Sequence, residues 1–295
     1  MVRSISGVLT VSEPTGPNVP VVFDSPHSGA DYPDDLGSIL PLSALRVTED
    51  AFVDQLYAAA PENGAVLLAA LFPRCFVDPN RSSVDLDPSS LDGPWPEPLI
   101  PSEKTLHLGS GLIWRTCYPD IPMYDRKFTV AEVRRRIDTF YKPYHAAVAG
   151  AIEAAHQQFS QVWHVNCHSM PSFSTAKSPE GPGNERPEFV LGDRDGTTAD
   201  PEFTALVRET LAGFGYEVTV NDPYKGAELV RAYSNPSAGR HSLQIEIKRA
   251  LYMNEVTIQP NAGFEALRVN ITRLIGVICN YAASKTCGMG SIGDE

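Results

Sequence analysis

The chain has 295 residues and a mass of 32.1 kDa, a length that suits one large domain or two small ones. Hydrophobic residues make up 42% of it and charged residues 20%, a globular composition that excludes a coiled coil, a collagen-like fibre and a disordered tail. The formal net charge of −12 argues against nucleic-acid binding, which depends on clustered cations, and the densest basic run is only residues 134–136.

Three absences narrow the class of protein further. No run of about 18 uncharged apolar residues occurs, so no membrane-spanning segment is predicted. The first residues lack the apolar run of a secretory signal. The five cysteines have no CxxC spacing, which predicts neither a zinc ribbon nor a disulfide framework and favours reduced thiols. We therefore expect a cytoplasmic protein.

The order of apolar runs and turn residues gives the secondary structure. Runs that end in turn residues predict strands at 20–23, 65–70, 75–78, 161–167, 189–192, 216–221 and 243–247. Helical spacing predicts helices at 51–60, 129–156, 201–212 and 264–283. Asp50 is expected to cap the first helix, Thr129 and Glu132 to form a capping box for the second, and Pro143 to kink it.

Strands alternate with helices along the whole chain. This alternation predicts a three-layer α/β/α architecture, with helices on both faces of a mixed, mostly parallel central sheet. We expect a single domain over 1–295, with its core over about 18–285 and long loops near 80–125 and 170–188. In such sheets ligands bind beyond the carboxyl ends of the strands, so the polar residues there are the first candidates for a functional site.

Two histidines share one sequence context, a strand followed by His-Ser. His27 follows the strand at 20–23, and His168 follows the strand at 161–167. Asp50, with Glu49 beside it, opens the first helix. Two imidazoles and a carboxylate could form a three-ligand Zn²⁺ site that leaves one position to water, and other divalent transition metals suit the same ligands. The plain alternative for either histidine is a hydrogen-bonded core or surface residue.

Glu246 lies inside a predicted strand, between Ile245 and Ile247. Because side chains alternate along a strand, its carboxylate faces away from the core that the isoleucines fill. Near a metal-bound water such a carboxylate can act as a general base. The plain alternative is a salt bridge to Lys248 or Arg249.

Four arginines follow turns or strand ends, namely Arg81, Arg115, Arg240 and Arg249. An arginine holds a carboxylate through two parallel hydrogen bonds, so this set predicts a pocket for a small anion. The usual alternative is surface pairing with the 36 acidic side chains of the chain.

Together these residues resemble the N-formylglutamate amidohydrolase family. The matching pieces run in the family's order over roughly residues 20–280. They are residues 25–29 (SPHSG), Asp50 with 53–57 (VDQLY), 77–81 (VDPNR), 111–113 (GLI) with Arg115, 166–170 (NCHSM) and 244–255 (QIEIKRALYMNE). The ordered set is more specific than any of its members.

The resemblance implies a fold of the zinc-carboxypeptidase and phosphorylase/hydrolase kind. It also implies metal-assisted cleavage of a small, acidic N-formyl or N-acyl amino acid, first of all N-formyl-L-glutamate. Carried over, it makes His27, His168 and Asp50 the Zn²⁺ ligands, with Glu49 as the alternative carboxylate. One departure from zinc carboxypeptidases concerns their His-x-x-Glu motif, because Ala30 stands where the glutamate would follow His27.

The resemblance also assigns the remaining site residues. Glu246 falls at the position of the general base, and Arg81 would stabilise the oxyanion. Substrate contacts would come from Asn80, Arg115, Arg240, Arg249 and Tyr252.

Three other functions stay open on the sequence. A hydrolase of this fold could act on another N-acyl amino acid or a peptide. The arginine pocket could bind a small dicarboxylate without catalysis. A cysteine hydrolase could use Cys167 beside His168, although adjacent strand residues point to opposite faces.

Overall fold

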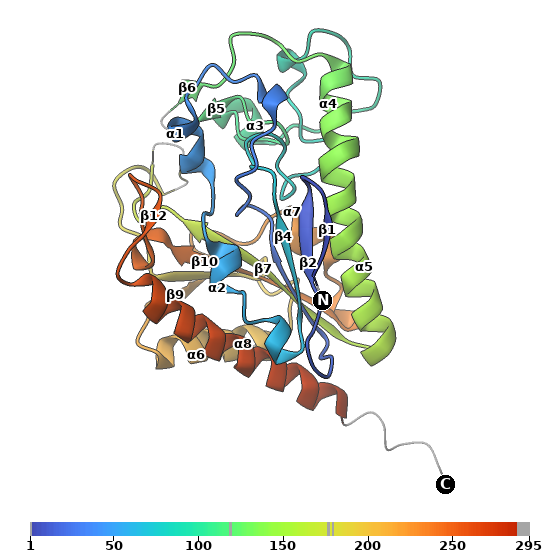
Figure 1. The fold of residues 1–295 in the computed structure, drawn as a ribbon, viewed down its shortest axis with the longest axis vertical. Coiled ribbons are helices and arrows are strands. Elements are labelled where there is room, and N and C mark those ends of the chain that lie inside the picture. Colours follow the sequence, from blue (N-terminus) through green and yellow to red (C-terminus); the bar gives the residue numbers. More distant parts are fainter. Residues whose placement is uncertain (1, 118–119, 176–177, 179, 288–295) are drawn as a thin grey trace.

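Eight strands form one mixed sheet at the centre of the molecule (Figure 1). The structure, a computed structural model, describes residues 2–117, 120–175, 178 and 180–287. In sheet order the strands are β1 (Val2–Ile5), β2 (Leu9–Ser12), β4 (Val66–Ala70), β3 (Val21–Ser25), β7 (Val162–Met170), β10 (Arg240–Lys248), β8 (Phe189–Gly192) and β9 (Val218–Val220). The middle four, from β4 to β10, are parallel, whereas β2 and β8 flank them in antiparallel pairing. This arrangement confirms the predicted mixed, mostly parallel sheet.

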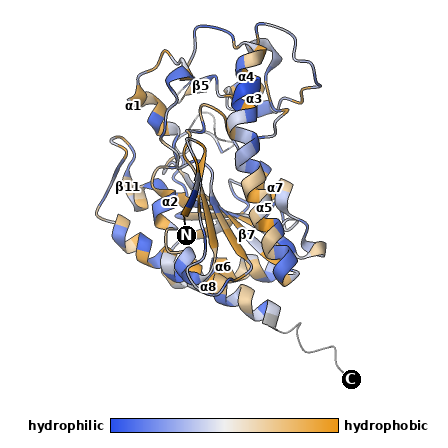
Figure 2. Cartoon of the chain, turned by 45° about the vertical axis from the view of Figure 1, so that its right-hand side comes forward, coloured by the Kyte–Doolittle hydropathy of each residue, from blue (hydrophilic) through white to orange (hydrophobic). Residues whose placement is uncertain are grey.

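Helices cover both faces of this sheet. They are α1 (Leu42–Leu45), α2 (Val53–Leu56), α3 (Glu103–Leu108), α4 (Val130–Arg136), α5 (Lys142–Phe159), α6 (Pro201–Gly213), α7 (Glu228–Tyr233) and α8 (Phe264–Cys287). The helices α2, α6 and α8 pack on one face and α4, α5 and α7 on the other, with a separate apolar core under each set. The strands between them are mostly hydrophobic (Figure 2). The three-layer prediction is therefore confirmed.

Strand β7 shows how one sequence serves two layers. Val165 and Cys167 belong to the core under α6 and α8, while Val162 belongs to the core under α5. Because successive side chains point to opposite faces, Asn166, which lies between Val165 and Cys167, faces the α5 side. The same alternation places His164 and His168 on that face, so that a row of polar side chains forms there.

The long helix predicted over 129–156 forms as α4 and α5, joined by a π-helical turn at Ile137–Tyr141. The Thr129 hydroxyl accepts a hydrogen bond from the Glu132 N–H, which is one half of the predicted capping box, whereas the Glu132 carboxylate pairs with Arg126 and Arg136. Pro143 lies just after the π-helical turn, where the backbone already departs from α-helical hydrogen bonding. The expected interruption is thus absorbed by a wider turn, and the helix continues.

Several expected elements differ in the structure. The strand expected at 75–78 is a turn, closed by a hydrogen bond from the Phe76 N–H to the Pro73 carbonyl. The helix expected at 51–60 shortens to α2, because Phe52 takes a left-handed conformation with φ of 66°. Asp50 does not cap it. The loop expected near 80–125 contains α3, which Ser102 caps.

Smaller differences follow at the strand ends. β1 and β2 form an antiparallel hairpin that the sequence patterns did not predict. β7 continues to Met170, so that His168 lies within a strand rather than after it. The chain also forms two small hairpins, β5 (Thr116–Cys117) with β6 (Ile121–Pro122) and β11 (Met253–Asn254) with β12 (Gln259–Pro260). None of the described helices is long and apolar enough to cross a membrane.

Candidate active site

Polar side chains form a compact lattice across the three middle strands β3, β7 and β10. Asp24 of β3 stands opposite Asn166 of β7, which stands opposite Gln244 of β10. Two residues further along the same strands, His168 stands opposite Glu246. Residues paired in register point to the same face, so the period-2 pattern of the sequence brings these groups together.

The base of the lattice is a hydrogen-bonded network without exposed members. Asp24 accepts hydrogen bonds from the Tyr144 hydroxyl of α5 at 2.9 Å and from the Asn166 amide at 2.8 Å. His164 lies between Asp24, at 2.8 Å, and the Ser242 hydroxyl, at 2.6 Å. His164 is therefore structural, and the network fixes the orientation of the Asn166 amide.

His27, Asp50 and His168 meet at the upper edge of the lattice. The Nδ1 atoms of His27 and His168 lie 3.3 and 3.0 Å from the same atom, Asp50 Oδ2. All three side chains are buried, and their ligand atoms lie within 4.8 Å of one another. The structure thus brings together the three residues that the sequence placed in a metal site.

Hydrogen bonds at the far ring nitrogens favour one tautomer of each histidine. His27 Nε2 lies 2.8 Å from Asp78 Oδ1, and His168 Nε2 lies 2.6 Å from Asn166 Oδ1. Both oxygens accept hydrogen bonds, so each Nε2 is placed to donate to its oxygen. In that tautomer both Nδ1 atoms turn a lone pair toward the Asp50 carboxylate. Lone pairs that converge in this way are the donor set of a divalent transition metal, and these residues fit one.

Asp50 is held in place from its other oxygen. The Arg249 guanidinium donates to Asp50 Oδ1 at 3.0 Å, and also to Ser169 Oγ and the Val47 carbonyl. Glu49, the alternative carboxylate, points elsewhere and pairs with Arg46. Between the two carboxylates, only Asp50 faces the histidine pair.

Asp78 is a residue beside His27 that the sequence patterns did not single out. Its carboxylate accepts from His27, from Arg74 at 2.9 Å, from Trp114 Nε1 at 3.1 Å and from the Asn80 N–H at 2.9 Å. Although burial opposes ionisation, Arg74 and then His27 hold the pKa of Asp78 well below its usual value. A charged carboxylate hydrogen-bonded to a ring nitrogen fixes the orientation of that imidazole. Its position in the sequence could have indicated this, because Asp78 belongs to the segment 77–81 that also contains the candidate residues Asn80 and Arg81.

A cavity of about 740 Å³ opens in front of the histidine pair. Glu246 lines it and accepts a hydrogen bond from Gln244 Nε2 at 3.0 Å. Burial raises the pKa of Glu246, because it disfavours the charged form of the carboxyl group. Its neighbours Ile245 and Ile247 fill the opposite core, as the alternation predicted.

The cavity wall is cationic, in contrast to the net charge of the whole chain. Its cations are Arg74, Arg81, Lys104, Arg186 and Arg249. Asn80 also lines it, with its Nδ2 3.1 Å from His168 Nε2. The predicted convergence of arginines therefore occurs, but with a partly different set of residues.

Three predicted substrate contacts lie elsewhere. Arg240 begins β10, at the end remote from the histidines, and pairs with Glu153 at 2.6 Å. Arg115 pairs with Asp87 at 2.8 Å within the 80–125 segment. Tyr252 is buried in the core under α8. None of the three lines the cavity.

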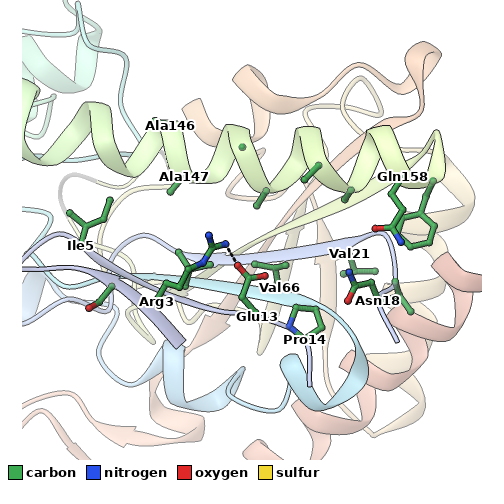
Figure 3. A pocket seen from close by; sticks show the side chains of 18 residues that line it. Arg3, Ile5, Glu13, Pro14, Asn18, Val21, Val66, Ala146, Ala147 and Gln158 are labelled. Carbon is green, nitrogen blue, oxygen red and sulfur yellow. Dashed lines mark hydrogen bonds and ion pairs between the residues drawn. The ribbon is translucent and has the colours of Figure 1, made fainter. Parts of the chain in front are cut away.

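Cys167 and a second cavity both lie apart from the candidate active site. Cys167 points into the opposite core, and burial raises the pKa of its thiol well above the usual value, which disfavours a nucleophilic role. A second cavity, of about 600 Å³, lies between α5 and the β1–β2 hairpin (Figure 3). Its wall is formed by small side chains such as Ala146 and Ala147 and by the Arg3–Glu13 ion pair, without any of the predicted site residues.

Comparisons with known proteins identify the family of this chain. Residues 19–253 match the sequence model of the N-formylglutamate amidohydrolase family. The crystal structure of N-formylglutamate amidohydrolase from Ralstonia eutropha JMP134 is similar with a TM-score of 0.91 and 48% identity, covering 95% of this chain and 99% of that one. N-formylglutamate deformylase from Pseudomonas aeruginosa is 28% identical over 241 residues, 80% of this chain and 83% of that protein. The Pseudomonas putida enzyme of the same name is 25% identical over the same shares. The chain therefore belongs to the N-formylglutamate amidohydrolase family.

Proposed function

We propose that this protein hydrolyses N-formyl-L-glutamate to L-glutamate and formate. The observation that carries the proposal is the cationic cavity that adjoins the His27–Asp50–His168 cluster and the Glu246 carboxylate. The names of the relatives from Ralstonia and Pseudomonas support the substrate.

We assign His27, Asp50 and His168 as the ligands of a divalent metal, with Zn²⁺ as the first choice and other transition metals as alternatives. Such an ion would supply Lewis acidity at the formyl carbonyl and a bound water of lowered pKa. The orientation of the two imidazoles comes from Asp78 and Asn166.

Glu246 is the proposed general base. Its carboxylate accepts the proton of the attacking water and returns it to the amide nitrogen as the C–N bond breaks. Its raised pKa makes the protonated form accessible for the second step. Arg74, 3.9 Å from Asp50, lies close to where negative charge develops, and it is our candidate for stabilising the oxyanion.

Arg81 is better suited to the substrate carboxylate than to the oxyanion. Its Nε donates to the Ser110 carbonyl at 3.1 Å and its NH1 nitrogen to the Asn80 carbonyl at 2.9 Å, which fixes the plane of the guanidinium. The remaining N–H groups are available to a ligand in the cavity. A fixed guanidinium fork matches the geometry of a carboxylate.

The test is formate release from N-formyl-L-glutamate by the purified, metal-analysed protein. Glu246→Gln keeps the shape of the side chain and its contact with Gln244, and should lower kcat by about 10²–10⁴-fold. Glu153→Gln, a surface substitution beside Arg240, is the matched control and should leave kcat unchanged. Near-native turnover by Glu246→Gln with its metal bound would remove Glu246 from this role.

The same preparation separates the alternative functions. A dicarboxylate-binding protein would bind N-formylglutamate without releasing formate. A hydrolase for another N-acyl amino acid would act faster on a different member of a panel of N-formyl and N-acetyl amino acids. A cysteine hydrolase would lose activity on thiol alkylation and keep it with a metal chelator.

A further inference from the structure

The cations of the cavity differ in whether a carboxylate of the chain already neutralises them. Arg74 pairs with Asp78 at 2.9 Å. Arg186, which is buried, pairs with Glu180 at 3.0 Å. Arg249 pairs with Asp50 at 3.0 Å. Each of these three guanidinium groups is therefore already paired with a carboxylate of the chain.

Arg81 and Lys104 are different. Within the described ranges, neither has a carboxylate oxygen within 4.0 Å, although both line the cavity. The two are also joined through Ser110, whose carbonyl accepts from Arg81 and whose N–H donates to the Lys104 carbonyl at 3.3 Å. The short helix α3 thus fixes Lys104 relative to Arg81.

The charge environment of Lys104 agrees with an unneutralised ammonium group. The residue as a whole is solvent-exposed, but its ammonium loses hydration against the cavity wall. That loss, followed by the charges of Arg81 and Arg74, lowers the pKa of Lys104 to about 8, while Glu246 and Asp78 act in the opposite direction. A carboxylate bound here would offset the repulsion among the cations.

We propose that Lys104 binds the side-chain carboxylate of the substrate, while Arg81 binds the α-carboxylate, so that Lys104 determines the preference for an acidic N-formyl amino acid. This inference rests on the proposed function. Which cation binds which carboxylate follows from the substrate, because the α-carboxylate is attached to the carbon next to the scissile nitrogen and must lie nearer to the histidines. Arg81 follows Asn80, which contacts His168, so Arg81 is assigned to the α-carboxylate. Lys104 lies on α3 at the exposed side of the cavity and is assigned to the side-chain carboxylate.

The test compares N-formyl-L-glutamate with N-formyl-L-glutamine, which has almost the same shape but no side-chain charge. For each enzyme variant, the ratio of the two kcat/KM values is measured by formate release, and the ratio of the two dissociation constants by calorimetry. Lys104→Gln should lower both ratios roughly tenfold or more, the loss of one charge-assisted hydrogen bond. Lys104→Arg should keep most of the preference.

Lys142→Gln is the matched control, because Lys142 is exposed and pairs with Asp138 far from the cavity. It should leave both ratios unchanged. Lysine and glutamine have similar helix propensities, so α3 should form in Lys104→Gln, and circular dichroism checks this.

Unchanged ratios in Lys104→Gln would overturn the inference, and so would an equal loss for both substrates. Absence of formate release from either substrate by the unmodified protein would instead refute the proposed function. The calorimetric ratio then still decides the role of Lys104.

Discussion

Replacing Asp78 with asparagine tests whether this buried carboxylate orients His27. Asp78 is fully buried, and its two oxygens accept from His27, Asn80, Arg74 and Trp114. All of these partners are donors. An asparagine can offer only one acceptor oxygen, so its amide nitrogen must face N–H groups on one side or the other.

The expected cost follows from these contacts. A buried donor that loses its acceptor costs about 1–3 kcal/mol. Removing one partner of a buried ion pair, here the Arg74–Asp78 pair, costs about 3–5 kcal/mol. Asp50, 3.9 Å from Arg74, offsets part of that charge. We therefore expect Asp78→Asn to lower the free energy of unfolding by roughly 3–5 kcal/mol, and metal affinity to fall about 10–100-fold as the ring of His27 loses its support.

Two measurements separate these effects. Urea unfolding followed by circular dichroism gives the free energy of unfolding, and competition with a chromophoric chelator gives the Zn²⁺ affinity of the folded protein. Asp138→Asn, which removes an exposed carboxylate paired with Lys142, is the control and should change stability by at most about 1 kcal/mol. If Asp78→Asn destabilises the fold but binds Zn²⁺ with the affinity of the unmodified protein, Asp78 does not act through His27 and the reasoning is wrong.

Two other predictions concern the cations. Arg81→Gln should lower kcat/KM for N-formylglutamate roughly tenfold or more, whereas Arg240→Gln should leave it unchanged, because Arg240 pairs with Glu153 away from the cavity; equal effects in a formate-release assay would contradict the assignment. The preference for N-formylglutamate over N-formylglutamine should decline as the pH rises through about 8, because Lys104 of the free enzyme then loses its proton. Lys104→Arg should show no such decline over the same pH range, and a flat profile in the unmodified protein would refute this reading.

Much of the site could be predicted because it depends on short-range patterns. Residues near the carboxyl ends of neighbouring parallel strands lie close together, which is why the proximity of His27, just past β3, and His168, near the end of β7, followed from the sequence. Alternation within β10 likewise predicted which way Glu246 would point.

The surroundings of the arginines could not be predicted from local sequence patterns. Arg81, Arg115 and Arg240 have similar local contexts in the sequence, each after a turn or strand end. Their surroundings differ, because Asp87 and Glu153 form ion pairs with Arg115 and Arg240 in the folded chain, whereas no described carboxylate oxygen lies within 4.0 Å of the Arg81 guanidinium. Such partners are brought together by tertiary packing, which no local pattern encodes.

The same limit applies to secondary structure. Residues 75–78 are apolar enough for a strand, yet a turn at 74–76 interrupts the run, and the Asp78 carboxylate that follows it contacts His27. Here tertiary contacts, rather than local propensity, accompany the observed backbone conformation.

The hydrogen-bonded row beneath the His27–Asp50–His168 cluster has a consequence for how this family can vary. Asp24, His164, Asn166 and Tyr144 each complete the hydrogen bonding of another member, in a layer closed to water. A single apolar replacement would leave a buried partner unsatisfied, whereas a joint replacement of several members would not. Substitutions in this row should therefore show strong epistasis, and over evolutionary time its members should be retained or exchanged as a set.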